Sequence, residues 1–138
     1  MSERRLQETI AVLAILGAGI AGYLTVAHVT HTPVACVRSG GCETVQHSAY
    51  SELWGIPVAA IGLAGYLLIA VSSRRRTDPA RVAGAAAALA GLVFAAYLVY
   101  VQVGVIHAVC QWCMASDVVV ALLVVATFLR ISRSAAPR

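Results

Sequence analysis

Four long apolar runs, separated by short polar or charged segments, make up most of the chain. They cover residues 10–29, 56–71, 82–106 and 109–129. A bilayer core of about 30 Å needs about 20 helical residues, so each run predicts a membrane-spanning helix, the second one short and the third one long. The pattern therefore predicts an all-α integral membrane protein, built as a bundle of four transmembrane helices.

The charged residues lie mostly between and beyond these runs. All ten basic residues are arginine, and nine of them fall in three groups, at residues 4–5, 74–81 and 130–138. By the positive-inside rule, these three segments face the cytoplasm. Both termini are then cytoplasmic, and the loop of residues 30–55 and the tight turn near His107 face the outside.

Composition agrees with this topology. With 60% hydrophobic residues and a mean hydropathy of +0.84, the chain is too apolar for a soluble domain. Its 138 residues are too few for more than one unit, so we expect a single domain over residues 1–138. The net charge of +4 follows from topology, and no nucleic-acid partner is indicated, because a phosphate-binding stripe needs Lys and Arg gathered on one soluble face.

One motif inside the first run could be mistaken for a dinucleotide-binding site. The letters GAGIAG at residues 17–22 match a dinucleotide-binding fingerprint. That fingerprint follows a buried strand and opens a helix, whereas this copy lies within a continuous apolar run. We interpret it as a small-residue face on which helices pack closely.

The outer loop holds most of the polar chemistry. Residues 39–41, Ser-Gly-Gly, predict a turn between Cys36 and Cys42. Apolar positions then recur at helical spacing over residues 42–53. This spacing predicts a short amphipathic helix lying on the membrane surface.

The predicted topology brings all four cysteines to the outer side. Cys36 and Cys42 lie in the loop, and Cys110 and Cys113 lie at the start of the fourth run. A single buried cysteine often behaves as a small hydrophobe, but two pairs facing an oxidising compartment indicate redox chemistry. At a helix start, backbone N–H groups and the macrodipole favour a thiolate, most strongly at Cys110.

The two pairs predict an electron relay. Cys36 and Cys42 enclose five residues, so they can form a flexible disulfide that reaches outward to a partner and inward to Cys110. Electrons would pass from an external dithiol protein to the loop pair, then to Cys110 and Cys113, and then to an acceptor in the membrane. Quinone is the natural lipid-soluble two-electron acceptor.

Asp117 is a further candidate. On a helix it shares one face with Cys110 and Cys113, and an ionisable residue at membrane depth is costly and indicates function. We expect Asp117 to be largely neutral and to donate a hydrogen bond or proton to a quinone oxygen. The alternative is a structural hydrogen bond to a neighbouring helix.

Two other functions fit some of these residues. The cysteines and the outer histidines could form a zinc or copper site; the C-x2-C half fits zinc, but the C-x5-C spacing is loose and no His-x3–5-His spacing accompanies it. A small transporter or structural subunit with structural disulfides is the other alternative. It predicts that Cys110→Ala lowers stability and leaves the redox state of other proteins unchanged.

The outer loop and the second apolar run contain the sequence CVRSGGCETVQHSAYSELWGIPVAAIGLAGY, and CQWC follows much later. Together these two segments closely resemble bacterial members of the vitamin K epoxide reductase family. The resemblance covers essentially the whole chain. It implies a four-helix bundle around a quinone, capped by the loop and a short surface half-helix. Cys110 and Cys113 match the active-site pair, with Cys113 nearer the quinone, Cys36 and Cys42 match the shuttle pair, and Ser48 matches a pocket serine that hydrogen-bonds the substrate.

The resemblance also implies an activity and a location. We expect a quinone-linked oxidoreductase of the bacterial inner membrane that generates disulfides and uses menaquinone or ubiquinone. Many bacterial members carry a fused thioredoxin-like domain. This chain ends within nine residues of Leu129, so we expect its partner to be a separate extracytoplasmic thioredoxin-fold oxidase. Trp112, an aromatic residue at the outer boundary, is expected to join Ser48 and Asp117 at the quinone site; the alternative is that it anchors the helix at the membrane boundary.

Overall fold

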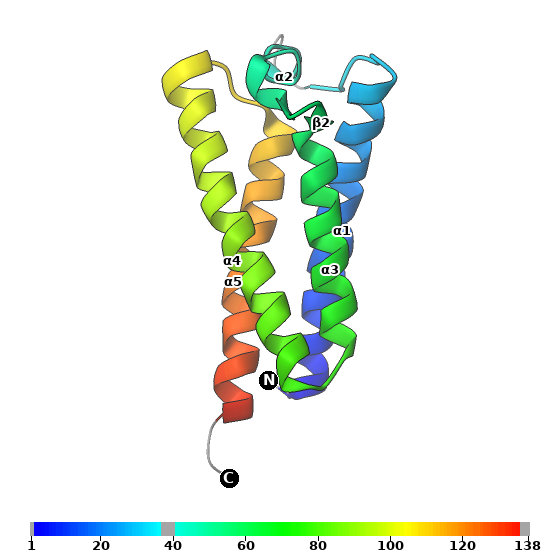
Figure 1. The fold of residues 1–138 in the computed structure, drawn as a ribbon, viewed down its shortest axis with the longest axis vertical. Helices are drawn as coiled ribbons and strands as arrows, with labels where there is room; N and C mark the ends of the chain where they lie inside the picture. Colours follow the sequence, from blue (N-terminus) through cyan, green and yellow to red (C-terminus); the bar gives the residue numbers. More distant parts are fainter. Residues whose placement is uncertain (1, 37–40, 136–138) are drawn as a thin grey trace.

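The structure, a computed structural model, describes residues 2–36 and 41–135. Its framework is a bundle of long helices that run up and down side by side (Figure 1). These helices are α1 (Glu3–Val29), α3 (Val58–Arg74), α4 (Asp78–Tyr100) and α5 (Gln111–Ala135). The described termini and the α3–α4 turn lie at one end of the bundle, and the loop that follows α1 lies at the other.

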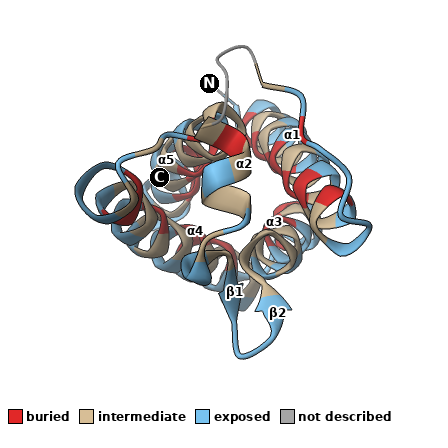
Figure 2. Ribbon diagram, turned by 90° about the horizontal axis from the view of Figure 1, so that it is seen from above, coloured by how far each residue is buried: buried red, intermediate tan, exposed pale blue. Residues whose placement is uncertain are grey.

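Short elements cover this other end. They are the helix α2 (Gly41–Gln46), the 3-10 turn η1 (Ala49–Ser51), the strands β1 (Glu52–Leu53) and β2 (Ile56–Pro57), and the π-helical segment η2 (Val101–Ile106) that continues α4. Seen from above, α2 lies over the middle of the bundle and the β1–β2 hairpin projects from its side (Figure 2). The strands pair antiparallel, with Glu52 opposite Pro57 and Leu53 opposite Ile56.

Capping residues, rather than the apolar runs, decide where the helices begin. The Ser2 hydroxyl accepts the Arg5 N–H, so α1 begins seven residues before its apolar run. Thr77 caps α4 in the same way. The helix α3 begins at Val58 instead of residue 56, because Ile56 and Pro57 pair with β1.

Within the described residues, 2–36 and 41–135, three helical stretches are long and apolar enough to cross a membrane. They are Glu3–Val29, Asp78–Ile106 and Gln111–Ala135, whereas the apolar helix Val58–Arg74 has 17 residues. At about 1.5 Å per residue, α3 is about 26 Å long, somewhat less than a typical bilayer core. The prediction of a helical membrane protein is confirmed.

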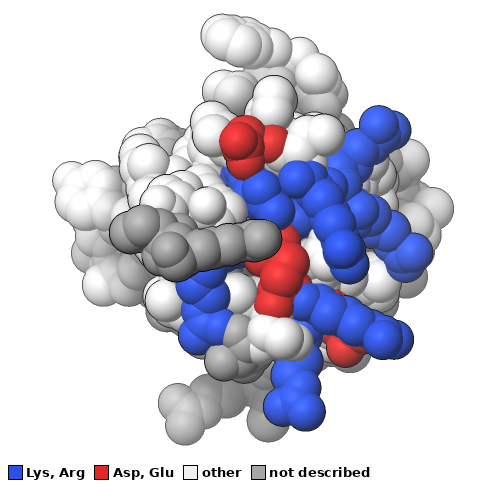
Figure 3. Space-filling view, turned by 90° about the horizontal axis from the view of Figure 1, so that it is seen from below, with Lys and Arg blue, Asp and Glu red and all other residues white. Residues whose placement is uncertain are grey.

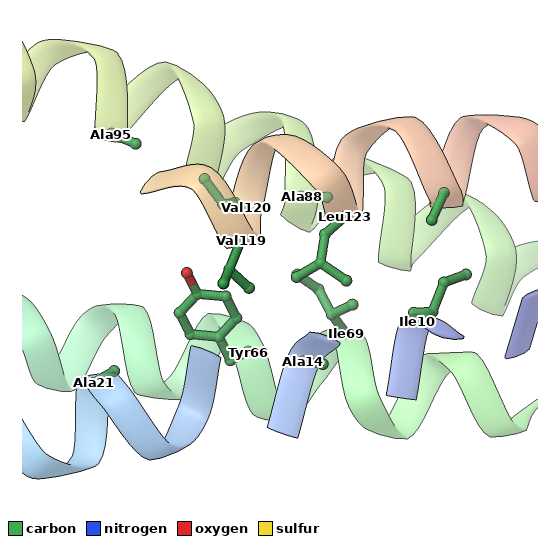
Figure 4. Packing of buried hydrophobic residues seen from close by; sticks show 11 residues of the cluster. Ile10, Ala14, Ala21, Tyr66, Ile69, Ala88, Ala95, Val119, Val120 and Leu123 are labelled. Atoms are coloured by element: carbon green, nitrogen blue, oxygen red, sulfur yellow. The ribbon is translucent and has the colours of Figure 1, made fainter. Parts of the chain in front are cut away.

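The core is a narrow seam where the four helices meet (Figure 4). Ile10 and Ala14 of α1, Ile69 of α3 and Leu123 of α5 are almost fully buried within it. Tyr66 of α3 crosses the seam. Its ring lies against Gly17, where an added Cβ would overlap it, and its hydroxyl donates to the Ser116 carbonyl oxygen at 2.8 Å. The packing interpretation of GAGIAG is confirmed at Gly17, whereas Gly19 and Gly22 face open space.

Charge is segregated along the bundle axis. Arginines gather at the end that carries the termini and the α3–α4 turn (Figure 3). Arg130 is buried there and donates to Glu3 at 2.9 Å, and Arg81 donates to the same carboxylate at 3.3 Å. The cysteines lie at the opposite end, beside α2 and the start of α5.

The predicted surface helix over residues 42–53 is wrong beyond Gln46. The chain leaves the helix because Ser48 is extended, with φ −74° and ψ 161°. Leu53 and Ile56 then join the hairpin, whose two turn residues, Trp54 and Gly55, have φ of 53° and 80°. Positive φ at both positions is typical of a tight type I′ turn, and this turn takes residues 52–57 out of helical geometry.

Candidate functional site

All four cysteines belong to one apolar cluster. Cys42 and Cys110 are fully buried within it, and Cys36 and Cys113 pack against it. Cys36 and Cys42 form a disulfide, whereas Cys110 and Cys113 are free thiols. The structure thus brings the two sequence-predicted pairs together, with a disulfide in the loop and a dithiol at α5.

A glycine permits the close contact between the loop and the C-x2-C segment. Gly41 is the first residue of α2, and an added Cβ there would overlap the carbonyl oxygen of Val109. Gly41 precedes Cys42, and Val109 precedes Cys110. Because the backbones touch at this point, the two buried cysteines lie in neighbouring positions.

Cys110 occupies the N-cap of α5. Its carbonyl oxygen accepts the Met114 N–H at 3.0 Å, the first bond of the helix, and its sulfur accepts the Cys113 N–H at 3.4 Å. A side chain that accepts from the third helical residue is the usual N-cap arrangement. The expected helix start at the C-x2-C motif is confirmed, with Cys110 just before the helix and Cys113 in its first turn.

These contacts stabilise a thiolate at Cys110. A hydrogen bond from the Cys113 side chain lowers the pKa of Cys110 from an ordinary value of 9.0 to about 7. Burial acts in the opposite direction, and the backbone N–H groups of Cys113 and Trp112 and the side chain of Gln46 assist the lowering. A thiol of this pKa is both an effective nucleophile and a good leaving group at neutral pH.

A cavity of about 390 Å³ lies next to the dithiol, between the long helices and beneath the end of α2. This volume is within the range of roughly 300–1,000 Å³ typical of small-molecule sites. Most of the lining surface is apolar, with contributions from α1, α3, α4 and α5, and the polar lining residues include Ser48, Gln102, Cys113 and Asp117. Of the two thiols, Cys113 is the one that lines the cavity.

Asp117 lines the cavity with an unsatisfied oxygen. Its Oδ2 is buried and has no hydrogen-bond partner within residues 2–36 and 41–135. The structural alternative, a bond to a neighbouring helix, is absent from this part of the chain, since the nearby Tyr66 hydroxyl bonds to Ser116 instead. A buried oxygen of this kind costs free energy unless a ligand or water satisfies it. An apolar cavity with one such group fits a planar ligand that carries an oxygen, such as a quinone.

Ser48 and Trp112 lie at different positions relative to the cavity. Ser48 lines the cavity just beyond the end of α2, and its hydroxyl donates to the Val45 carbonyl oxygen at 2.7 Å. The Trp112 indole N–H donates to the Ala35 carbonyl oxygen, and its ring centroid lies 5.1 Å from that of Tyr23. Trp112 is not among the lining residues of the cavity; it instead ties α5 to the segment that leads to Cys36.

Two glutamines that were not predicted from the sequence lie beside the dithiol. The Gln46 side chain lies 3.9 Å from the Cys113 sulfur and also lines the cavity. Gln102 is 2% exposed, and its Oε1 accepts the Cys110 N–H at 2.8 Å. The sequence holds a signal for Gln102, which is a lone amide inside an apolar run.

Two of the outer histidines pair with glutamates. His28 pairs with Glu52 at 2.8 Å and His47 with Glu43 at 3.0 Å, beside a second, more polar hollow of about 310 Å³. Within the part of the chain that the structure describes, no three His, Cys, Asp or Glu side chains come together as metal ligands would. The geometry of these residues therefore gives a metal site no support.

A protein-family model also matches this chain. The model of the vitamin K epoxide reductase family matches residues 8–128. The match covers most of the chain, including the four cysteines, the loop and the cavity-lining segments. The chain therefore belongs to the vitamin K epoxide reductase family and is, in general terms, a quinone-linked thiol oxidoreductase.

Proposed function

We propose that this protein generates disulfides in other proteins and passes the electrons to a membrane quinone, either menaquinone or ubiquinone. The donor is a thioredoxin-fold protein outside the cytoplasm. One observation carries the proposal: Cys113 lines an apolar cavity, while its partner Cys110 is buried in the same cluster as Cys42 of the loop disulfide. The dithiol thus has one sulfur, that of Cys110, next to the loop disulfide and the other, that of Cys113, at the cavity.

Exposure suggests the order of the loop cysteines. Cys36 is partly exposed and Cys42 is fully buried, so a partner thiolate attacks Cys36 and releases Cys42. The Cys42 thiolate then attacks Cys110 of an oxidised Cys110–Cys113 pair and releases Cys113. The second thiolate of the partner attacks its own sulfur in the mixed disulfide with Cys36, which completes the partner's disulfide and releases the Cys36 thiolate. Attack by Cys36 on Cys42 then re-forms the loop disulfide and releases Cys110, whose low pKa makes it a good leaving group.

The last step oxidises the C-x2-C dithiol. Cys110 and Cys113 together lose two electrons and two protons and form a disulfide, and the quinone in the cavity is reduced to the hydroquinone. Asp117, with an unsatisfied buried oxygen, supplies a hydrogen bond or proton to one quinone oxygen. Ser48 supplies a second hydrogen bond from the cavity rim. In a bacterial membrane, epoxide reduction would be incidental.

The proposed location is the bacterial inner membrane. The arginine-rich end faces the cytoplasm by the positive-inside rule, which leaves the cysteines and α2 on the extracytoplasmic side. The fourth crossing is α3, whose 17 residues suffice if the bilayer thins slightly around it. Cysteine labelling by a membrane-impermeant reagent in intact cells tests this orientation, because single cysteines placed near Arg75 should remain unlabelled.

The decisive experiment measures the reaction directly. Reduced, purified protein is mixed with a soluble naphthoquinone, quinol formation is followed by absorbance, and free thiols are counted by alkylation and mass. About one quinol per thiol pair lost is expected, and Cys113→Ala should abolish quinol formation. No quinol, with four thiols intact and metal in the sample, would overturn the proposal in favour of a metal site.

A further inference from the structure

Gln102 connects the reactive dithiol to the cavity. It lies in η2, where a π-helical segment interrupts the regular end of α4, and π-helical turns are often found at functional sites. Its side chain is 2% exposed, although an amide buried without hydrogen bonds costs free energy. The contacts that satisfy this amide show what the residue holds in place.

Three backbone N–H groups converge on Gln102. Its carbonyl oxygen accepts the N–H groups of His107 and Ala108, the latter at 3.0 Å. Its side-chain Oε1 accepts the Cys110 N–H at 2.8 Å. An N-cap residue has no intrahelical acceptor for its own N–H, so Gln102 supplies the one that Cys110 lacks. The turn before α5, including Cys110, is therefore anchored to this single residue.

This anchor also orients the amide. The Cys110 N–H can only donate, so the oxygen of the Gln102 carboxamide must face it and the nitrogen must point elsewhere. Gln102 is among the lining residues of the cavity, together with Cys113 and Asp117. Within residues 2–36 and 41–135, the Gln102 Nε2 has no hydrogen-bond acceptor. One amide thus holds the dithiol with its oxygen and keeps its N–H groups available to the cavity.

We propose that Gln102 is a quinone-binding residue, whose Nε2 donates a hydrogen bond to a quinone oxygen while Oε1 holds the backbone of Cys110. This inference rests on the proposed function. It adds a donor to the cavity from η2, separate from the carboxyl of Asp117 on α5. The same amide keeps the bound ring in a constant position relative to the dithiol, which orientation-dependent reactions require.

Two substitutions separate the roles of the two amide atoms. Gln102→Met removes both the acceptor and the donor at nearly constant size. Gln102→Glu keeps an acceptor for the Cys110 N–H but lacks the donor while its carboxyl is ionised. When the carboxyl is protonated, its O–H can replace the lost N–H. Gln7→Met is the matched control, because Gln7 is another hydrogen-bonded helical amide, half-buried and bonded to the Ser73 carbonyl oxygen at the opposite end.

The test measures the Kd of a soluble naphthoquinone for the full chain in detergent, with both cysteine pairs oxidised so that no turnover occurs. Each variant is compared with wild type at the same pH, because the other ionisable side chains around the cavity and the turn are the same in both proteins. Near neutral pH, both Gln102 variants should bind about fivefold to tenfold more weakly. Burial at this position raises the pKa of the introduced carboxyl above its ordinary value of about 4.3. The deficit of Gln102→Glu should therefore disappear as the pH falls from about 8 to about 5, whereas that of Gln102→Met should persist.

The outcomes are distinct. If wild type binds and Gln102→Glu binds equally well at every pH, or keeps a deficit that does not change with pH, the role of Gln102 is overturned and the proposed function stands. If wild type does not bind the naphthoquinone, both proposals fall. Melting temperatures near wild type for Gln102→Glu and Gln7→Met confirm that folding does not explain the result.

Discussion

Cys110 and Cys113 stand three residues apart, yet their surroundings give them different chemistry. Cys110 is buried beside Cys42, and hydrogen bonding from Cys113 lowers the pKa of Cys110 to about 7. In reduced protein, its thiolate should therefore form as the pH rises through about 7. Replacing Cys113 with Ala should move this midpoint up toward 9.0, as measured by the ultraviolet absorbance of the thiolate. Cys110→Ala should lack the step, and an unchanged midpoint in Cys113→Ala would contradict the assigned cause.

Asp117 supports a second prediction at the residue scale. Its buried, unsatisfied Oδ2 makes it the proposed proton donor, and Asn keeps its size without an acidic proton. Positioned acids contribute roughly 10²–10⁴-fold to a rate, so Asp117→Asn should slow quinol formation by about a hundredfold. Asp78→Asn serves as control, since Asp78 is exposed near the start of α4. Turnover of Asp117→Asn at the wild-type rate would remove the proton-donor role.

At the scale of elements, the contact between α2 and the segment before α5 matters most. Gly41 permits this contact, because any Cβ there would overlap the Val109 carbonyl oxygen. Gly41→Ala should displace α2 together with Cys42 and slow exchange between the two cysteine pairs. Overpacking of this kind costs about 1–3 kcal/mol, and the exchange rate is measured by acid quenching followed by alkylation and mass.

Gly22→Ala is the control for this contact. Gly22 lies within α1 and faces open space, so its Cβ meets nothing. Exchange in this variant should match wild type, and its stability should be equal or slightly higher, since Ala favours helix over Gly. If Gly41→Ala exchanged disulfides as fast as Gly22→Ala, the proposed path through Cys42 would be wrong.

At the scale of the whole molecule, one ion network joins the helices at the arginine-rich end. Arg130 of α5 donates to Glu3 of α1 and to the carbonyl oxygens of Ser72 and Arg75, and Arg81 of α4 also donates to Glu3. Removing the carboxylate leaves a buried guanidinium without a counter-charge. Because Glu3 is partly exposed, Glu3→Gln should destabilise the bundle by about 1–3 kcal/mol, measured by thermal unfolding in detergent.

Glu8→Gln provides the comparison. Glu8 pairs with Arg4 on the surface of α1, where the two side chains are 62% and 83% exposed. Exposed pairs at this spacing contribute about 0.3–0.5 kcal/mol, so the melting temperature should barely change. Equal destabilisation by Glu3→Gln and Glu8→Gln would show that the buried network does not hold the helices together.

The sequence by itself determined the class of the protein and the residue types of its chemistry. Apolar runs and arginine groups predict membrane helices and their charged ends, because the cost of burying charge in lipid applies to each segment separately. Helix capping also depends only on residues that are close in the sequence, so a helix start at the C-x2-C motif could be predicted. The small-residue packing at Gly17 followed from the same reasoning.

Only the tertiary structure decided which of these residues meet. The disulfide-bearing loop lies against Cys110 because Gly41 contacts Val109, and Gln102 reaches Cys110 across the turn after η2. The cavity collects side chains from four helices and the end of α2, which explains why Asp117 lines it and Trp112 does not. These relations depend on how distant segments pack and on where α2 ends. Neither hydrophobic periodicity nor spacing along one helix contains that information.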